Sequence, residues 1–218
     1  MKVLLTGGTG QLGISIIKNK PSDVILLNPK KSEFDLRDLD SCKLYIEYEK
    51  PDWIINSGAY TDVEKAELEK DEVLKINYKA VANISNILSD YGGKLLQIST
   101  DYVFDGNKKE PYETFDKTNP LNIYGISKLR AENYIRKILT AKNQYLILRT
   151  SWLMSPFSKN FLLTIIKLLK ERESIKVINN QIGSMTSAHY LSKTCWKLID
   201  KNNYYSKEKK FLPPIHHW

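Results

Sequence analysis

A glycine-rich turn directly after an apolar strand constrains this chain more than any other feature. Residues 2–6 form the apolar run, and Gly7, Gly10 and Gly13 follow it with the spacing GxxGxxG. A turn that binds a pyrophosphate must bend tightly, let the ligand approach its backbone and pack a helix on the strand, and each demand removes a Cβ. The amides at the start of that helix then bind phosphate oxygens. The sequence predicts a strand–turn–helix unit that holds a dinucleotide, with an ordinary glycine turn as the alternative.

Strands and helices alternate along the rest of the chain. Apolar runs predict further strands at 24–27, 53–56, 94–99 and 145–149, and helical spacing covers 11–19, 38–49, 71–91, 124–142 and 187–200. This order with short connections predicts an α/β fold, a doubly wound parallel sheet covered by helices on both faces. Ligands of such sheets bind beyond the carboxyl ends of the strands.

Charge and cysteine content narrow the class of protein. The net charge is +8, but 28 of the 33 basic residues are lysines dispersed along the chain, which indicates a solvated surface and no nucleic-acid partner. We interpret Cys42 and Cys195 as buried thiols in a reducing compartment. No apolar run approaches the roughly 18 residues of a membrane span, so we expect no membrane partner and a cytoplasmic location.

The predicted strand ends carry residues suited to the cofactor. After 24–27 there is no carboxylate for a ribose 2′-hydroxyl, whereas Lys30 and Lys31 could accept a 2′-phosphate. This favours NADPH; a solvated lysine loop is the alternative, and NADH stays open. Asp35 and Leu36 follow where the chain returns past the adenine. After 53–56 come four further candidates beside the cofactor, Ser57, Gly58, Ala59 and Tyr60, for which a plain buried turn is the alternative.

A possible acid–base pair follows the strand at 94–99. Ser99 and Thr100 end that strand, and Tyr124 and Lys128 lie four residues apart on one face of the predicted helix. A nearby ammonium would lower the phenol pKa from about 10 towards the working pH. Tyr124 is therefore a candidate general acid or base, with Thr100 bonding the substrate oxygen. A surface pair is the alternative for Tyr124 and Lys128.

These features together resemble the dTDP-4-dehydrorhamnose reductase family of extended short-chain dehydrogenases/reductases. The resemblance covers about residues 1–200, and STDYVF followed by YGxxK is specific to this branch. The matching runs are GGTGQLG (7–13), KPDWIINSGAYTDVEKAE (50–67), INYKAV (76–81), QISTDYVFDG (97–106), PLNIYGISKLRAE (120–132), LRTSW (148–152), NF (160–161) and VINNQIGSMTSA (177–188).

The resemblance implies a Rossmann-like fold and a reductase. Members reduce the C4 ketone of a dTDP-4-keto-6-deoxy-L-sugar to dTDP-L-rhamnose, a precursor of cell-surface polysaccharide. Thr100, Tyr124 and Lys128 would form the catalytic trio, and Lys128 would also hold the nicotinamide ribose. The cofactor positions would be Gly7, Gly10, Gln11, Leu12, Gly13, Lys30, Lys31, Asp35, Leu36, Ser57, Gly58, Ala59, Tyr60, Ser99, Tyr124 and Lys128.

Three residues match positions that the family places near the sugar, namely Tyr102, Trp152 and Asn160. Tyr102 could instead be a packing aromatic, and Trp152 a core tryptophan. Met185 replaces the proline that usually precedes Thr186, which loosens a turn near the substrate lobe.

The end of the chain departs most from the family, whose members run longer. We expect a cofactor domain over 1–150, and over 151–218 an incomplete substrate-binding lobe with a divergent tail, consistent with a truncated product. Pro213 and Pro214 stand where a strand is expected, so His216 and His217 are interpreted as a terminal tail and not as metal ligands. Some relatives are homodimers and some bind Mg²⁺, but this chain supports no metal site.

Two other functions remain open. One is a reductase or epimerase acting on another nucleotide-sugar with the same trio. The other is a non-catalytic NADP-binding or regulatory subunit, because this branch also resembles the regulatory subunit of methionine adenosyltransferase. The intact Thr100, Tyr124 and Lys128 argue against the second, and the short C-terminus keeps it in consideration.

Overall fold

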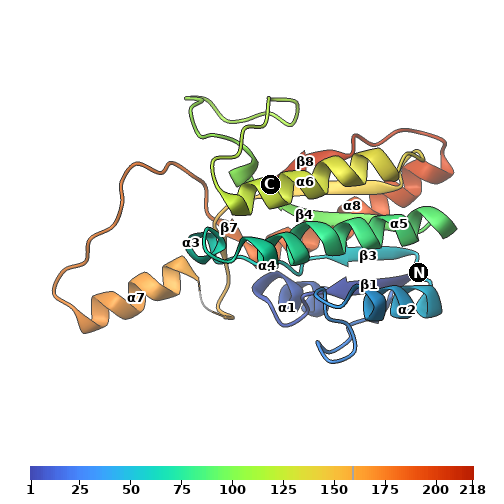
Figure 1. Cartoon of the computed structure of the whole chain (residues 1–218), viewed down its shortest axis with the longest axis horizontal. Coiled ribbons are helices and arrows are strands. Elements are labelled where there is room, and N and C mark those ends of the chain that lie inside the picture. The colour runs from blue at the N-terminus through green and yellow to red at the C-terminus, as the bar shows by residue number, and fades with distance from the viewer. Residues whose placement is uncertain (159) are drawn as a thin grey trace.

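Six strands form one parallel sheet at the centre of the molecule (Figure 1). The computed structural model describes residues 1–158 and 160–218. The sheet has the order β2-β1-β3-β4-β5-β8. The chain adds β2 on one side of β1 and the later strands on the other side, so the switch point of the strand order lies between β1 and β3. The predicted doubly wound sheet is therefore confirmed. Its strands are β1 (Lys2–Thr6), β2 (Ile25–Leu27), β3 (Trp53–Asn56), β4 (Lys94–Thr100), β5 (Tyr145–Thr150) and β8 (Ile215–His217).

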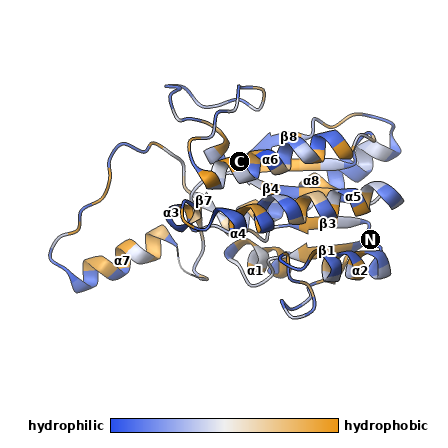
Figure 2. Cartoon of the chain, in the orientation of Figure 1, coloured by the Kyte–Doolittle hydropathy of each residue, from blue (hydrophilic) through white to orange (hydrophobic). Residues whose placement is uncertain are grey.

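Helices cover both faces of the sheet. Alternate residues of each strand point to opposite faces. Val3 and Leu5 pack in the core beneath α1 (Gln11–Lys18) and α8 (Ala188–Lys207). Leu4 packs in the other core, beneath α2 (Leu39–Glu49), α5 (Ala80–Tyr91) and α6 (Ile123–Ile138). Figure 2 shows polar and apolar residues mixed along α5 and α6, as expected of helices that present one face to a sheet.

The long helix predicted at 71–91 is helical throughout but changes type in the middle. It comprises α4 (Lys70–Leu74), a π-helical segment η1 (Lys75–Lys79) and α5, which ends at Gly92 with a φ of 81°. Two short helices follow strands: α3 (Val63–Ala66) comes after β3, and η2 (Asp101–Val103) comes directly after β4.

The helix predicted at 124–142 ends earlier, at Ile138. Leu139 leaves the helical conformation with a ψ of 74° and is fully buried, because the chain turns there toward the start of β5. Asn143 completes the turn with a φ of 61°. In contrast, the helix predicted at 187–200 continues as α8 to Lys207.

The interpretation of the C-terminus as a tail is wrong. Residues 215–217 form β8, which pairs with β5 through Ile147 and Ile215 in register. Pro213 and Pro214 precede the strand, and β8 lies at the edge of the sheet, where missing N–H donors are tolerated. His216 and His217 are consequently part of the sheet.

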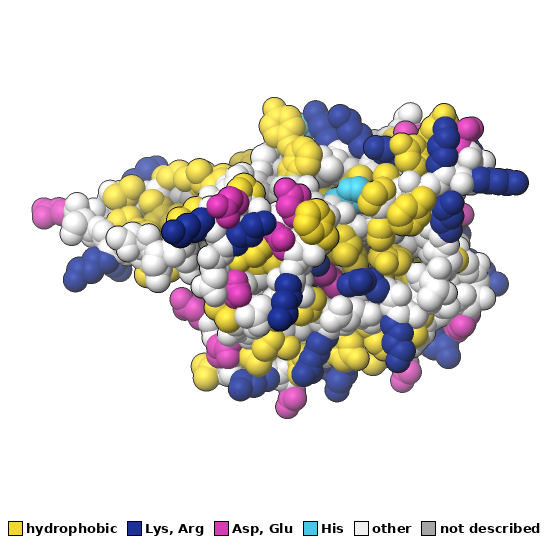
Figure 3. Space-filling model, turned by 90° about the horizontal axis from the view of Figure 1, so that it is seen from above, with side chains coloured by type: hydrophobic (Ala, Val, Ile, Leu, Met, Phe, Trp, Pro, Cys, Tyr) yellow, Lys and Arg dark blue, Asp and Glu magenta, His cyan; other side chains and the backbone are white. Residues whose placement is uncertain are grey.

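Only part of the lobe predicted at 151–218 stands apart from the sheet. Leu191, Cys195 and Leu212 are buried in the same core as Val3, so residues 188–217 belong with the sheet. What stands apart is the segment with β6 (Leu153–Met154), α7 (Phe161–Glu171) and β7 (Thr186–Ser187). Figure 1 shows α7 projecting from the body, and Figure 3 shows apolar side chains gathered over this projection. The large apolar residues exposed on α7 are Phe161, Leu162, Leu163, Ile166 and Leu169.

Two smaller expectations can be compared with the structure. Cys42 and Cys195 are free and buried, as predicted. Among the described residues, no helix is long and apolar enough to cross a membrane.

Truncation of a buried α8 side chain tests whether this helix belongs to the core. Leu191→Ala leaves a cavity between α8 and α1, and we expect it to lower the free energy of unfolding by about 2–5 kcal/mol. Tyr190→Ala, at a neighbouring exposed position, should change it by less than about 0.5 kcal/mol. Urea unfolding of both variants measures the difference, and equal effects would contradict the packing of α8.

Candidate active site

The glycine turn lies where the ends of β1 and β3 meet. Gly7 has a φ of 70°, and a Cβ there would lie 2.6 Å from the Gly58 nitrogen. A Cβ on Gly13 would lie 2.1 Å from the Gly7 carbonyl oxygen, so α1 approaches the turn through a position that only glycine allows. Gly10 precedes α1 without a side chain to cap it, which leaves the first amides of Gln11 and Leu12 for an anionic ligand.

A buried row of polar side chains ties the neighbouring strand ends together. The Thr6 hydroxyl donates to Asn56 Oδ1, and Asn56 Nδ2 donates to Gln97 Oε1 at 2.7 Å. The Thr6 oxygen also accepts from the Gly58 amide at 3.0 Å, and the Ser57 hydroxyl donates to the Thr6 carbonyl at 2.6 Å. These bonds hold the Ser57–Gly58 segment against the glycine turn.

The corner after β2 holds the expected cofactor side chains and one residue that the sequence reasoning missed. Lys30 and Lys31 are exposed. Asp35 binds Arg37 through a side-chain hydrogen bond, which lowers the Asp35 pKa to about 2. The missed residue is Asn28, because its Oδ1 lies 1.8 Å from where a Cβ on Gly8 would be. An amide directly after a strand was the available signal.

Asn77 is a second residue missed from the sequence. It is buried in η1, and its amide accepts from the Tyr60 N–H at 2.8 Å and donates to the Tyr60 carbonyl at 3.0 Å. The same Nδ2 lies 3.1 Å from the Ser127 hydroxyl, next to Lys128. Asn77 thereby joins the end of β3 to the helix with the candidate acid. Only its place in the INYKAV run hinted at this, because a π-helical turn cannot be read from sequence spacing.

The structure brings the predicted catalytic side chains to the end of β4. The Tyr102 amide donates to the Thr100 hydroxyl at 3.2 Å, and the Tyr102 and Tyr124 rings meet edge to face at 5.8 Å. Gly125 makes this approach possible, because a Cβ there would lie 2.2 Å from the Tyr102 carbonyl oxygen. Asn122 caps α6 by accepting from the Gly125 amide at 2.7 Å. The arrangement of the candidate catalytic residues therefore depends on the close contact between the first turn of α6 and η2.

Burial sets the protonation of Tyr124 and Lys128. Desolvation raises the Tyr124 pKa to about 12, although a hydrogen bond with Thr100 opposes the rise. Desolvation lowers the Lys128 pKa to about 8, and the charge of Glu132 opposes that fall. Lys128 Nζ donates to the Ile98 carbonyl at 2.6 Å. The expected lowering of the phenol pKa is thus wrong for this structure, because the ammonium is bound to a backbone oxygen and burial dominates.

Of the three residues expected near the sugar, Tyr102 lies in η2 beside Tyr124, whereas Trp152 and Asn160 lie in the projecting segment or beside it. Trp152 has a φ of 42° and is partly exposed, with its ring against Gly183, so it is not a core tryptophan. Asn160 caps α7 through the Leu163 amide at 3.0 Å and donates to Gln11 Oε1 at 3.0 Å. Gln11 therefore connects the glycine turn to this segment. The roles of Trp152 and Asn160 stay predictions.

Two buried charges complete the list of missed residues. Glu132 lies one turn beyond Lys128 on α6 and pairs with Arg149 of β5 at 2.6 Å. The signal was a lone acidic residue on the face of α6 that carries Lys128. In residues 1–158 and 160–218, no three His, Cys, Asp or Glu side chains form a group that could hold a metal ion.

Comparisons with known proteins agree with this arrangement. The family model described as "RmlD substrate binding domain" matches residues 1–217. A dTDP-4-dehydrorhamnose reductase from Aggregatibacter actinomycetemcomitans is 35% identical over 92% of this chain and 68% of its own length. The solved dTDP-4-dehydrorhamnose reductase from Clostridium acetobutylicum is 35% identical with a TM-score of 0.89, covering 100% of this chain and 74% of that one.

A second solved structure adds a ligand. The dTDP-4-dehydrorhamnose reductase from Bacillus anthracis, in complex with NADP, is 35% identical with a TM-score of 0.88, and the match covers 100% of this chain and 74% of that one. This chain spans between 63% and 69% of the length of the curated relatives that it matches.

Alanine substitutions in the glycine turn test its geometry. Gly13→Ala pushes a Cβ into backbone atoms, whereas at Gly10 the only near atom is the Gly7 oxygen at 3.3 Å. We expect Gly13→Ala to lower the free energy of unfolding by about 1–3 kcal/mol, despite the better helix propensity of alanine, and Gly10→Ala to have a smaller effect. Thermal unfolding compares them, and the opposite ranking would contradict the close approach of α1.

Proposed function

This chain belongs to the RmlD substrate binding domain family, and from that membership we propose that it is an NADPH-dependent reductase of a nucleotide-sugar ketone. The substrate is a dTDP-4-keto-6-deoxy-L-sugar, reduced at C4 to dTDP-L-rhamnose for polysaccharide synthesis. The observation that carries the proposal is the meeting of Thr100, Tyr124 and Lys128 at the end of β4, with the glycine turn at the end of nearby β1. Relatives that carry the name dTDP-4-dehydrorhamnose reductase support it.

The site residues fit a dinucleotide. The crowded cradle of Gly7, Gly13 and Gly58 leaves no room for side chains, and the first amides of α1, which no side chain caps, would bind the phosphates. Lys30 and Lys31 would bind the 2′-phosphate, and Asp35 and Leu36 would border the adenine. The NADP complex of the Bacillus anthracis relative supports this choice of cofactor. When bound, the reduced nicotinamide supplies a hydride.

The protonation states support a proton donor. Because the Tyr124 pKa is about 12, its hydroxyl keeps its proton at neutral pH and can give that proton to the ketone oxygen. Thr100 bonds the same oxygen and orients it. Lys128, with a pKa of about 8, is mostly an ammonium at pH 7 and would bind the nicotinamide ribose. Tyr102, Trp152 and Asn160 would contact the sugar.

The proposal also concerns the cellular location and the oligomeric state. The two free buried thiols are consistent with a cytoplasmic enzyme. A homodimer stays a prediction. Two other activities are outcomes of the experiment below: reduction or epimerisation of a different nucleotide-sugar, and cofactor binding without turnover.

Removal of the Tyr124 hydroxyl tests the reaction. We expect the chain to oxidise NADPH in the presence of freshly generated dTDP-4-keto-6-deoxy-L-sugar, and Tyr124→Phe to lower kcat by about 100-fold or more. Absorbance at the NADPH band measures the rate. Tyr134→Phe is the matched control, because Tyr134 lies on the same helix with its hydroxyl bonded to Asn86.

The possible results separate the three activities. Equal rates in the Tyr124 and Tyr134 variants would remove Tyr124 from the mechanism. Turnover of other nucleotide-sugars alone would change the substrate. Tight NADPH binding by a chain that turns over nothing in the panel would favour the binding subunit.

Removal of two lysines tests the cofactor preference. We expect Lys30→Ala/Lys31→Ala to weaken NADPH binding by about tenfold, because charge-assisted bonds to the 2′-phosphate are lost, and to leave NADH binding unchanged. Fluorescence titration measures both dissociation constants. Lys197→Ala/Lys201→Ala, on exposed positions of α8, removes the same charge elsewhere. A similar loss for NADPH and NADH would contradict the assignment.

A further inference from the structure

A buried ion pair lies directly behind the candidate catalytic residues. Arg149 Nε lies 3.0 Å from Glu132 Oε1, and Arg149 Nη2 lies 2.6 Å from Glu132 Oε2. The side chains are 4% and 1% exposed, respectively. The fork geometry is the strong form of this interaction, since both carboxylate oxygens accept from the same guanidinium.

The Glu132 carboxylate also binds the strand that carries Thr100. The Ser99 hydroxyl donates to Glu132 Oε1 at 2.5 Å, and Ser99 immediately precedes Thr100 in β4. Glu132 stands four residues after Lys128 on α6, so both side chains lie on one face of the helix. One carboxylate thus joins β4, α6 and β5 at the level of the catalytic groups.

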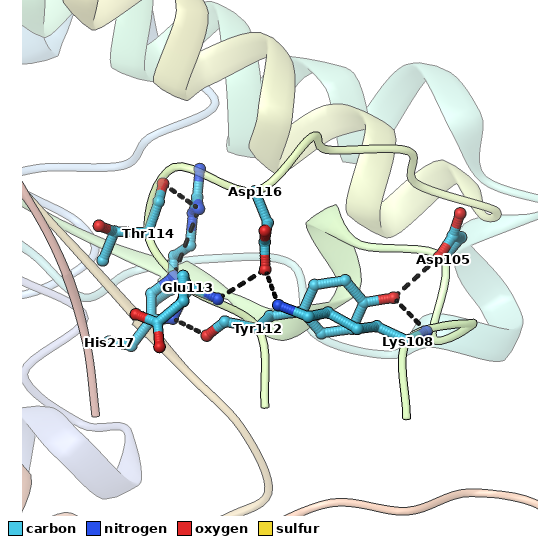
Figure 4. A network of polar contacts seen from close by, with 8 residues as sticks. Asp105, Lys108, Tyr112, Glu113, Thr114, Asp116 and His217 are labelled. Carbon is cyan, nitrogen blue, oxygen red and sulfur yellow. Dashed lines mark hydrogen bonds and ion pairs between the residues drawn. The ribbon is translucent and has the colours of Figure 1, made fainter. Parts of the chain in front are cut away.

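Arg149 extends the network to the edge of the sheet. Its Nη1 lies 3.4 Å from the Thr114 carbonyl and 3.3 Å from His217 Nε2. His217 Nδ1 lies 2.9 Å from the Tyr112 carbonyl, so this nitrogen donates and Nε2 accepts from Arg149. The ring of Phe104 lies 5.1 Å from the guanidinium carbon. Figure 4 shows His217 of β8 bonded to Tyr112 of the loop that follows η2, with Thr114 nearby.

Stability alone is a weak reason for such a pair. The cost of removing two charges from water often exceeds their attraction, and apolar residues of the same volume stabilise a core as well or better. What an apolar pair cannot supply is a negative charge one turn from Lys128. Burial favours the neutral amine of Lys128, and the Glu132 charge favours its ammonium.

We propose that Glu132 is a positioning residue for the reductase site, whose carboxylate anchors the end of β4 to α6 and maintains the positive charge of Lys128. The role given to Glu132 in the reaction rests on the proposed function, because the Lys128 ammonium is the group that would bind the nicotinamide ribose. The effect of the Glu132 charge on the Lys128 pKa can be measured without cofactor or substrate.

The direct test follows the titration of Lys128 in the cofactor-free chain. Carbon-13 NMR of labelled lysines reports the midpoint, and the signal that disappears in Lys128→Arg assigns it. We expect a midpoint near pH 8 in the unaltered chain and a lower midpoint in Glu132→Gln. Glu47→Gln, which removes an exposed carboxylate on α2, should leave it unchanged.

NADPH affinity gives a second readout. In the unaltered chain we expect affinity to fall as the pH rises through about 8, where Lys128 loses its proton. In Glu132→Gln this fall should begin at lower pH, with binding at pH 8 weaker by about three- to tenfold. Glu132→Asp keeps the charge on a shorter side chain and should restore the pH profile more fully than it restores the affinity.

Glu132→Gln leaves the buried Arg149 guanidinium without its charged partner, which lowers the stability of the fold. The variant Glu132→Gln/Arg149→Met removes both charges and should keep the fold. Because loss of the Arg149 cation opposes loss of the Glu132 anion, the Lys128 midpoint should still fall, but by less than in Glu132→Gln. An unchanged midpoint in a folded variant would overturn the inference, and so would loss of the fold in both variants, since Glu132 would then be structural only. If the unaltered chain does not bind NADPH, the proposed function fails, whereas the midpoint still decides the role of Glu132.

Discussion

The site depends on one constraint, the need to satisfy polar groups that are buried where the strands end. Thr6 and Asn56 end β1 and β3, Gln97 lies beside Asn56 in the middle of β4, and each of the three is at most 3% exposed. An unpaired amide or hydroxyl at that depth is costly, so the three side chains must bond to one another. These bonds tie the three neighbouring strands together, and the further bonds of Thr6 hold the Ser57–Gly58 segment against the glycine turn.

The same burial sets the chemistry of α6. It acts in opposite directions on its two titratable groups, since it disfavours a phenolate at Tyr124 and an ammonium at Lys128. A protonated phenol suits a proton donor, but a neutral lysine would not attract a ribose as well. The buried carboxylate of Glu132 counters the second effect and leaves the first in place. One acidic side chain thus favours the charged form of Lys128 without favouring the phenolate of Tyr124.

The sequence predicted the sheet well because its signals are local. Continuous apolar runs identify β1, β3, β4 and β5, and the glycine spacing locates the turn, since each depends on residues adjacent in the chain. The prediction failed at β8, where Pro213 and Pro214 were taken to end the fold. Those prolines leave the hydrogen bonds of β8 intact, and the strand is recognisable only by its partner β5, whose paired residues lie 68 positions earlier, as Ile147 does from Ile215.

The sequence by itself determined the fold class, the place of the glycine turn and the identity of the residues at each strand end. Only the tertiary structure revealed Asn28, Asn77, Glu132 and Arg149 as neighbours of the candidate site residues, the packing of α8 beside α1, and the burial that shifts the pKa values of Tyr124 and Lys128. The reason is physical: residue type and periodicity are local properties, whereas desolvation and pairing depend on which distant residues fold against a group.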